Sequence, residues 1–403
     1  MPRALSETTI ATVKATVPVL EAHGLDIVRA MYAHMFQNPE IKALFNQSHH
    51  SDEGSQPRAL AGAILAYAQN IDNLGVLTPT VERIAQKHVG LQILPEHYPH
   101  VADALLAAIE EVLGDAATPD VLSAWGEAYW FLADILIGRE ASLYRELETV
   151  EGGWSGWRNF TVVEVRRESE TITSFVLRPS DGKAVIRHRP GQYLTFWLDM
   201  PGQGPLKRNY SISSAPNGKT YRISVKREPY GIVSNWLHDH ATPGTELRVA
   251  PPAGDFYLPE RVERPVVLLS GGVGLTPMLA MLETVAERRP DFQTHYVHGA
   301  LNGAFHAMGP AVRSLAEKTD NMRVTTFYEA PRADDVPGRD FDRSGRIDGN
   351  WLRSETPVAE AEYYLCGPKP FMRAMVSELS ACGVPAERIR YEFFGPADEL
   401  LAA

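Results

Sequence analysis

Hydrophobic residues recur at intervals of three and four over residues 1–150, which is the spacing of one face of an α-helix. No strand-like alternation accompanies them, and prolines fall where helices would begin or end. We therefore predict an all-helical first domain over residues 1–150. Four stripes carry the pattern: Leu25, Val28, Tyr32 and Met35; Leu60, Ile64, Tyr67 and Ile71; Val101, Leu105, Ala108 and Val112; and Leu122, Trp125, Tyr129, Leu132 and Leu136.

The pattern changes to alternation between apolar and polar residues after a glycine- and tryptophan-rich segment, residues 151–157. Such alternation, interrupted by Pro/Gly turns, is typical of antiparallel strands. We predict an all-β domain, a barrel, over residues 151–262. Its expected strands are 160–166, 171–177, 193–198, 221–226 and 246–250.

From residue 263 to residue 403, short and wholly apolar segments alternate with helical patterns. Buried strands that alternate with helices indicate a parallel α/β sheet. This third domain has expected strands at 265–269, 294–298, 323–327, 363–366 and 389–393, and expected helices at 277–288, 311–318 and 371–380.

Composition excludes several classes of protein. The 403 residues include 50 acidic and 39 basic ones, a formal charge of −11, which argues against nucleic-acid binding or an anionic membrane surface. The two cysteines exclude a disulfide framework and a four-cysteine metal site. The first twenty residues lack a signal-peptide pattern, and Glu127 and Asp134 interrupt the most apolar stretch, so we expect a cytoplasmic protein.

His88 is the first candidate for chemistry. It continues the apolar stripe of residues 81–88 and should face the protein interior. A lone histidine of this kind is more often a hydrogen-bonded core residue than a metal ligand. However, Tyr98 also occupies an apolar position and Glu140 continues the last stripe, where a carboxylate is costly unless something holds it. A buried His–Tyr–Glu chain would make the imidazole a stronger ligand, so both interpretations stay open.

A second candidate lies in the β domain, where an arginine could clamp a pyrophosphate, an aromatic ring could stack on a flavin and a hydroxyl could bond a ring nitrogen. The alternative is an ordinary strand with a surface arginine. The residues are Arg208, Asn209, Tyr210 and Ser211, flanked by 190–193 and 221–226.

Two further motifs follow strands of the third domain. A glycine-rich turn follows one buried strand and opens a helix, the setting of a phosphate cradle, although Pro277 takes the place of the third glycine and a plain tight turn is equally compatible. At the end of a later strand, Cys366 is either a redox thiol or a small packing residue. The motifs are Gly271, Gly272, Val273, Gly274, Leu275 and Thr276, and Cys366, Gly367 and Pro368.

With these motifs in order, the whole sequence closely resembles the flavohaemoglobins. The helical part carries the resemblance in Tyr32 with Met35 and Phe36, in 38–46, 84–88 and 95–98, and in the helix 124–140. The resemblance implies haem b. It assigns His88 as the proximal iron ligand, Tyr98 and Glu140 as its support, Tyr32 and Gln56 as the distal polar pair, Phe45 and Leu60 as pocket walls, and Lys87 as a neighbour of a propionate.

The rest of the chain resembles the ferredoxin–NADP reductase superfamily and implies FAD with NADH or NADPH. Leu301 stands where many relatives carry an arginine, which leaves both nicotinamides open. The resemblance assigns Tyr193 and 208–211 to FAD, 271–276 and 366–368 to the nicotinamide side, Phe393, Phe394, Gly395 and Pro396 to FAD, and Glu392 to the contact between haem and flavin.

The resemblance implies a nitric oxide dioxygenase that converts nitric oxide and O2 to nitrate. It implies a monomer with no obligatory membrane or protein partner, and it allows a lipid or azole-type ligand over the haem. Two other functions remain: an oxygen-binding or gas-sensing globin with its own methaemoglobin-type reductase, and a flavin reductase that serves an external partner. Repeated consumption of nitric oxide at the expense of NAD(P)H distinguishes a dioxygenase from the first. A haem Soret band in the purified protein excludes the second, in which the globin part would be degenerate.

Overall fold

The computed structural model describes residues 4–45, 55–200, 202 and 204–394, without the side chains of residues 55 and 56. These residues form two compact units, one made mainly of residues up to 149 and the other mainly of residues from 150 onward. None of the helices in the described part of the chain combines the length and the apolar character needed to cross a membrane.

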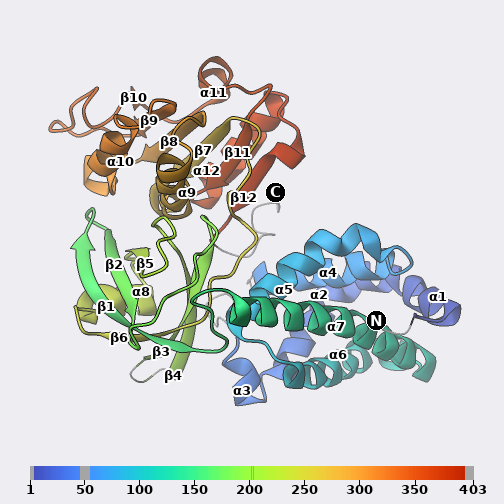
Figure 1. The fold of residues 1–403 in the computed structure, drawn as a ribbon. Coiled ribbons are helices and arrows are strands. Elements are labelled where there is room, and N and C mark those ends of the chain that lie inside the picture. The colour runs from blue at the N-terminus through green and yellow to red at the C-terminus, as the bar shows by residue number, and fades with distance from the viewer. Residues whose placement is uncertain (1–3, 46–54, 201, 203, 395–403) are drawn as a thin grey trace. The chain divides into compact units, whose positions relative to one another are not determined.

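The first unit is helical, as the periodicity predicted (Figure 1). Proline occupies the first or second position of several helices, where its missing N–H costs nothing. The helices are α1 Glu7–Ala15, α2 Val17–Met35, α3 Pro39–Lys42, α4 Ser55–Gln69, α5 Thr78–Leu91, α6 Tyr98–Leu113 and α7 Pro119–Thr149, with short 3-10 turns at η2 Leu74–Leu77, η3 Pro95–His97 and η4 Gly114–Ala116.

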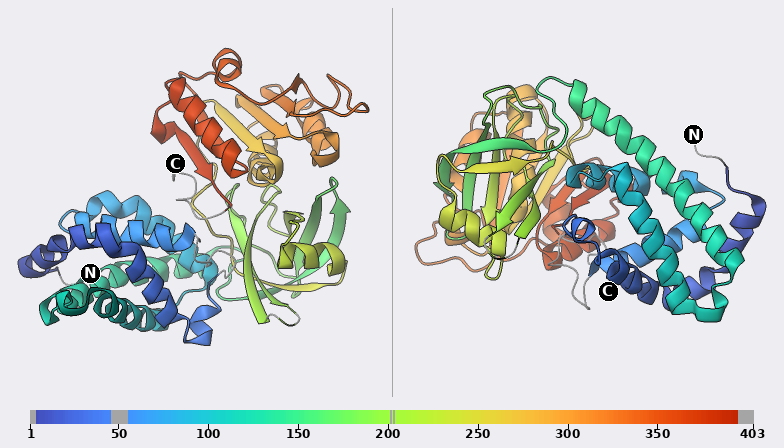
Figure 2. Two further views of the ribbon diagram at one scale, coloured as in Figure 1. Left: turned by 180° about the vertical axis from the view of Figure 1, so that it is seen from behind. Right: turned by 90° about the horizontal axis from the view of Figure 1, so that it is seen from below.

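The amphipathic faces of α2, α4, α6 and α7 enclose one core. Val28, Met35 and Trp125 are buried in it, at positions that the stripes placed inward. Two polar groups within this core are satisfied, since Trp125 Nε1 donates to Thr16 Oγ1 (3.3 Å) and the Tyr67 hydroxyl donates to the Ala128 carbonyl (2.8 Å). Figure 2 shows α7, in green, as the longest helix of the unit, lying alongside the other helices.

The second unit begins with a curled antiparallel sheet in the order β4-β3-β6-β1-β2-β5. A bridge between Ile212, directly after β4, and Ile223 of β5 joins the two outer strands, so the sheet curls round into the predicted barrel. Its strands are β1 Arg158–Arg167, β2 Ile172–Pro179, β3 Tyr193–Met200, β4 Gly204–Ser211, β5 Tyr221–Lys226 and β6 Glu246–Val249.

Two elements of this barrel differ from the sequence prediction. β4 is missing from the expected strands, although a strand was kept as an alternative for its residues 208–211, because its residues are mostly polar and show little apolar alternation. The helix α8 Ile232–His240 corrects the expectation of an all-β domain. It buries only Val233, Ser234 and Leu237, too short a stripe to signal a helix by period alone.

A parallel sheet in the order β10-β9-β8-β7-β11-β12 completes the unit, with β7 in its centre. Its strands were predicted except for the short β10, and its helices except for α11. The elements are β7 Val266–Gly271, α9 Leu275–Arg288, β8 Thr294–Ala300, α10 Gly309–Ala316, β9 Met322–Tyr328, β10 Arg343–Ser344, α11 Gly349–Glu355, β11 Glu362–Cys366, α12 Lys369–Ala381 and β12 Ile389–Glu392, with turns η5 Gly272–Gly274, η6 Gly303–Phe305 and η7 Ala386–Arg388.

Helices cover both faces of this sheet, which explains its wholly apolar strands. Val266 and Leu268 of β7 pack into a core that includes α9 and α10, whereas Val267 and Leu269 pack into a core that includes α11 and α12. Successive side chains of β7 thus point to opposite faces of the sheet and pack into two different cores. The predicted fold class is confirmed for both units.

Glu283 of α9 links the parallel-sheet part to the barrel through hydrogen bonds. Its two carboxylate oxygens accept from the Arg222 guanidinium (2.7 Å) and from the backbone N–H of Ala215 (2.9 Å). Both side chains of the ion pair are largely shielded from solvent, so the pair is screened less than a surface pair.

We predict that Glu283→Ala lowers the free energy of unfolding by about 1–3 kcal/mol, because it removes the carboxylate partner of Arg222, which keeps only its bonds to Ser213, and leaves the Ala215 N–H without its acceptor. Thermal unfolding, monitored by flavin fluorescence, measures the effect. The midpoint temperature should fall by roughly 2–4 °C for each kcal/mol lost. Glu287→Ala, one helical turn further along α9 and exposed, is the matched control and should leave the midpoint unchanged. Equal midpoints for the two variants would contradict the prediction.

Candidate functional site

His88, Tyr98 and Glu140 meet at the packing of α5, α6 and α7. His88 lies in the last turn of α5. Gln92 caps the end of this helix, and its left-handed backbone (φ 60°) turns the chain so that Tyr98 can open α6. Glu140 comes from α7. The three side chains that the sequence proposed as a chain are therefore brought together by three different helices.

A single carboxylate oxygen, Glu140 Oε1, joins the three groups. It accepts from the Tyr98 hydroxyl (2.7 Å) and from His88 Nδ1 (2.7 Å), and the Tyr98 oxygen lies 3.2 Å from Nδ1. Glu140 is only 2% exposed, so these donors replace the water that the carboxylate has lost. Because a carboxylate only accepts, Nδ1 carries the proton, and Nε2 keeps the lone pair that can bind a metal.

Tyr98 stays neutral in this cluster. Burial, and then the charge of Glu140, raise the pKa of its phenol above the ordinary value of 10.0. Its hydroxyl therefore remains a donor to Glu140 at any physiological pH. Across the described residues, no group of three or more His, Cys, Asp or Glu side chains forms a metal cage, so an iron at His88 would need ligands from a prosthetic group.

Tyr32 belongs to a second cluster in the same unit, with Phe36 and Phe45. The Tyr32 ring lies 5.4 Å from that of Phe36 and 5.7 Å from that of Phe45, the latter edge-on, and Leu60 packs against the same core. Burial raises the pKa of Tyr32, which keeps its phenol a neutral donor. Lys87 is exposed, and the side chain of Gln56 lies outside the described residues.

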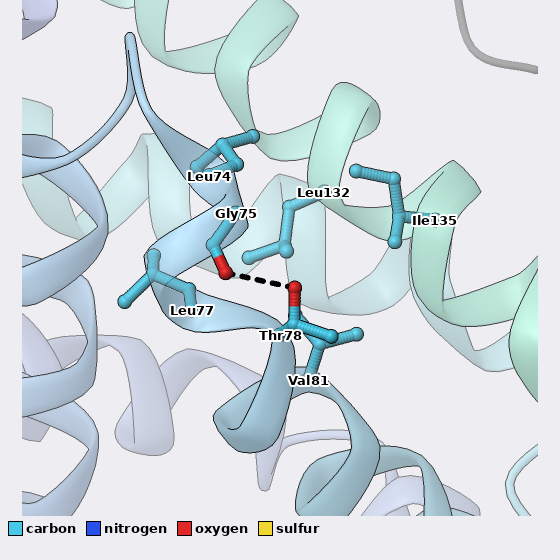
Figure 3. Close-up of a pocket in the computed structure, with 7 residues that line it drawn as sticks. All are labelled: Leu74, Gly75, Leu77, Thr78, Val81, Leu132 and Ile135. Atoms are coloured by element: carbon cyan, nitrogen blue, oxygen red, sulfur yellow. Dashed lines mark hydrogen bonds between the residues drawn. The ribbon is translucent and has the colours of Figure 1, made fainter.

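An apolar pocket of about 300 Å³ lies between η2, α5 and α7 (Figure 3). Val81 and Leu132 line it, each about two helical turns before His88 and Glu140 in their own helices. The sequence did not predict this pocket. Since neither His88 nor any other expected haem residue lines it, the pocket is distinct from the histidine cluster.

Five of the residues proposed for FAD, Tyr193 and residues 208–211, lie at the start of β3 and the end of β4. The Tyr210 ring packs against Phe196 at 5.6 Å, and burial raises the pKa of its phenol. Asn209, to which the sequence gave no separate chemistry, accepts a hydrogen bond from Thr195 Oγ1 (2.9 Å) and so links β4 to β3. Ser211 is buried at the end of the strand.

Two side chains complete this group. Burial lowers the pKa of Arg208, although the guanidinium stays charged at neutral pH. The ring of Tyr193 lies so close to Gly254 that a side chain there would approach it to 3.0 Å, and Gly254 also has a positive φ of 110°. A glycine at this point lets the backbone pass over an aromatic face.

The glycine-rich turn and the Cys366 motif meet at the carboxyl ends of β7 and β11. Ser270 and Cys366 are neighbours in the parallel register, and a side chain on Gly274 would lie 2.1 Å from the Cys366 carbonyl. Gly272 has a φ of 53° and needs the same freedom. In an open α/β sheet this edge is where ligands bind.

The other residues of these motifs support the same edge. Leu275 is buried, Thr276 Oγ1 donates to the Val273 carbonyl (3.0 Å), and Pro368 caps α12. Gly367 lies against the Phe371 ring, which a side chain would approach to 2.6 Å. The sequence motifs therefore form one continuous surface rather than two.

Cys366 is wholly buried, and burial raises the pKa of its thiol well above the ordinary value, with a smaller contribution from Glu392. A buried, protonated thiol is unreactive, which favours the packing role over the redox role. Glu392 faces Cys366 in the register of β11 and β12. Phe393 and Phe394 follow it, whereas Gly395 and Pro396 lie outside the described residues.

A pair of histidines, His298 and His306, lies beneath this edge. His298, at the end of β8, is buried and bonds Ser270 Oγ through Nδ1 (2.8 Å), and its ring stacks on His306 at 4.9 Å. Burial, its largest cause, lowers the pKa of His306 to about 4, so this ring is neutral at pH 7.

Comparison with known proteins agrees with this architecture. The chain matches the family model Globin over residues 29–136, Oxidoreductase FAD-binding domain over 159–257 and Oxidoreductase NAD-binding domain over 268–377. These matches follow the predicted order of the domains.

Full-length relatives and solved structures extend the match. A flavohemoprotein of Xylella fastidiosa (strain 9a5c) is 54% identical over 404 residues and covers all of both chains, and one of Rhodopirellula baltica is 46% identical over 99% of this chain and all of the relative. The crystal structure of a flavohemoglobin from Malassezia yamatoensis with bound FAD and heme superposes with a TM-score of 0.86 at 28% identity, covering 98% of this chain and 100% of that one. The FAD/NAD-binding domain of a nitric oxide dioxygenase from Vibrio cholerae is 39% identical over 59% of this chain and 99% of that one, with a TM-score of 0.55. The chain belongs to the flavohaemoprotein family.

Proposed function

We propose that this chain is a nitric oxide dioxygenase, which converts nitric oxide and O2 to nitrate with electrons from NAD(P)H. The observation that carries the proposal is the buried His88–Tyr98–Glu140 cluster on a chain that also holds FAD- and NAD-binding oxidoreductase domains. The Vibrio cholerae relative of the reductase part is the FAD/NAD-binding domain of a nitric oxide dioxygenase, and the Malassezia yamatoensis structure contains FAD and heme.

The residues fit the three cofactors that the family implies. His88 Nε2 would bind the haem iron, with Phe45 and Leu60 beside the porphyrin and Lys87 near a propionate. When bound, the nicotinamide supplies a hydride, the flavin divides the electron pair and the haem carries the oxygen chemistry. Residues 208–211 with Tyr193 and residues 393–396 would hold FAD, and residues 271–276 and 366–368 the nicotinamide.

Glu140 acts through His88. By accepting the Nδ1 proton it fixes the tautomer and the ring orientation, and it raises the basicity of Nε2. A more basic imidazole donates more electron density to its ligand, which favours activation of oxygen over reversible storage. Tyr98 donates a second hydrogen bond to the same oxygen and so helps to hold the carboxylate in place.

Tyr32 and Gln56, the distal polar pair, would act on the bound O2 rather than on His88. Because burial keeps the Tyr32 phenol neutral, it can donate a hydrogen bond to a partly negative oxygen without first losing water. Glu392 would tune the approach of flavin to haem from the end of β12, and the Cys366 thiol stays protonated and fills space beside the nicotinamide.

We further propose that the enzyme is a monomer, and that it works in the cytoplasm, where NADH and NADPH are supplied. A lipid or azole-type ligand could occupy the distal side. The second candidate function, an oxygen-binding or gas-sensing globin with its own reductase, uses the same cofactors. Only repeated consumption of nitric oxide at the expense of NAD(P)H separates the two.

The proposal is tested with the purified holoenzyme. We expect a haem Soret band, a flavin spectrum, and loss of nitric oxide with formation of nitrate in aerated buffer that contains NADH or NADPH. Absence of the Soret band, or a loss of nitric oxide that does not depend on the nicotinamide, would overturn it.

We predict that Glu140→Gln weakens the bond between iron and His88, because a neutral amide pulls less strongly on the Nδ1 proton than a carboxylate. The Fe–His stretching frequency should fall, and nitric oxide turnover should fall by about 10-fold. Glu146→Gln, on the same helix but paired with Arg139 at the surface, is the control. An unaltered stretching frequency in Glu140→Gln would count against the role of Glu140.

For Tyr32→Phe we expect O2 to leave the reduced haem about 10-fold faster, which corresponds to the loss of one hydrogen bond of about 1.4 kcal/mol. Flash photolysis or stopped-flow release measures the rate. Tyr67→Phe removes a buried phenol that donates to the Ala128 carbonyl instead and should leave O2 release unchanged. The distal role of Tyr32 fails if both variants release O2 like the unchanged protein.

A further inference from the structure

A groove with a volume of about 900 Å³ opens on the second unit, and none of the residues proposed for FAD or the nicotinamide is among those that line it. Its walls are the loop after β2, the loop before β5 and the residues that follow α7, Val150 and Glu151. The two loops are tied together, since the Val185 N–H donates to the Gly218 carbonyl (3.1 Å).

Four basic side chains and one acidic side chain line the groove. Arg178, Lys183, Arg187 and Lys219 are all exposed, and Glu151 is the only acidic residue among the lining ones. In a chain with a formal charge of −11, such a concentration of positive charge is a local exception. A cleft lined by one sign of charge attracts small ions of the opposite sign.

The four cations of the groove are not held in ion pairs in the described part of the chain. Within the described residues, none of the four forms an ion pair with a carboxylate, and Arg187 uses Nη1 only for the Pro216 carbonyl (3.2 Å). The nearby carboxylate of Asp181 is engaged by Arg158, at 2.6 and 3.1 Å, and this pairing lowers the pKa of Asp181. Asp181 is therefore engaged mainly by Arg158 and only weakly, through a longer-range Coulombic attraction, by Lys183.

The loops that carry the lysines are fixed by their own hydrogen bonds. Asn217 Oδ1 accepts from the N–H groups of Lys219 (2.8 Å) and Thr220 (2.9 Å), and Asp181 Oδ1 accepts from the Lys183 N–H (3.0 Å). Gly218, with a φ of 73°, lies against the Arg187 side chain. The backbone is thus ordered before any ligand arrives, which lowers the entropic cost of binding.

We propose that this groove binds a phosphorylated small molecule that carries at least two negative charges. Arginine presents a planar fork that matches phosphate oxygens, and lysine adds a mobile point charge, so the four together suit a phosphate better than a single carboxylate. The volume lies in the range of small-molecule sites and exceeds what one phosphate fills. The ligand would contact Val150 and Glu151, the first residues after the haem-binding part of the chain.

Calorimetric titration of the holoenzyme with inorganic pyrophosphate tests the proposal, with NAD⁺ present to fill the nicotinamide site. We expect one site, an affinity that falls as salt is added, and at least about 10-fold weaker binding to the double variant Lys183→Ala, Lys219→Ala. The side chains of these two lysines make no hydrogen bond among the described residues, so the fold should tolerate their loss.

The control removes two exposed cations elsewhere, Lys318→Ala with Arg353→Ala, and should bind pyrophosphate like the unchanged protein. If the lysine variant proves unstable, Arg178→Gln provides the same comparison. No binding, or equal loss in test and control variants, overturns the proposal. So does tight binding of polyglutamate without any response to pyrophosphate, which would assign the groove to an acidic protein partner.

Discussion

The helical unit depends on one buried carboxylate. Glu140 is almost wholly shielded from water, and an unpaired charge in that position would cost several kcal/mol. His88 and Tyr98 supply the two hydrogen bonds that make its burial tolerable. The requirement acts on the fold as well as on the chemistry, because three helices must pack so that three side chains meet within hydrogen-bond distance.

Local structure makes that meeting achievable. The left-handed cap at Gln92 ends α5 one turn after His88, and its side chain donates back to the Val89 carbonyl (2.7 Å). The chain can then return within a few residues to start α6 at Tyr98. The same arrangement leaves Nε2 of His88 as the atom available to a metal, so the packing requirement and the proposed ligand role have a common origin.

Close backbone approach plays the corresponding part in the parallel sheet. Gly274 lies where any side chain would collide with the Cys366 carbonyl, so the glycine-rich turn and the end of β11 form one surface. Cys366 fills the space beneath it as a buried, protonated thiol. The groove of the barrel does not depend on close backbone approach. There, hydrogen-bonded loops hold four cations that form no ion pair among the described residues at the surface of an acidic protein.

The periodicity of apolar residues was sufficient to predict the fold class and most helices and strands. It failed at β4 and α8, because a mostly polar strand and a short helix bury too few residues to leave a pattern. Among the candidate site residues, His88 and Glu140 could be singled out because polar groups on apolar stripes require partners. Which partners they have, at which distances, was beyond the sequence.

The sequence by itself therefore determined the order of the elements, the residues that face inward and the motifs that carry chemistry, because these depend on neighbours within one helix or strand. Only the tertiary structure decided that Asn209 holds β4 to β3, that His306 stacks on His298, and that four cations share one groove. These contacts join residues from separate elements, and their geometry follows from how whole helices, strands and loops pack rather than from any local pattern.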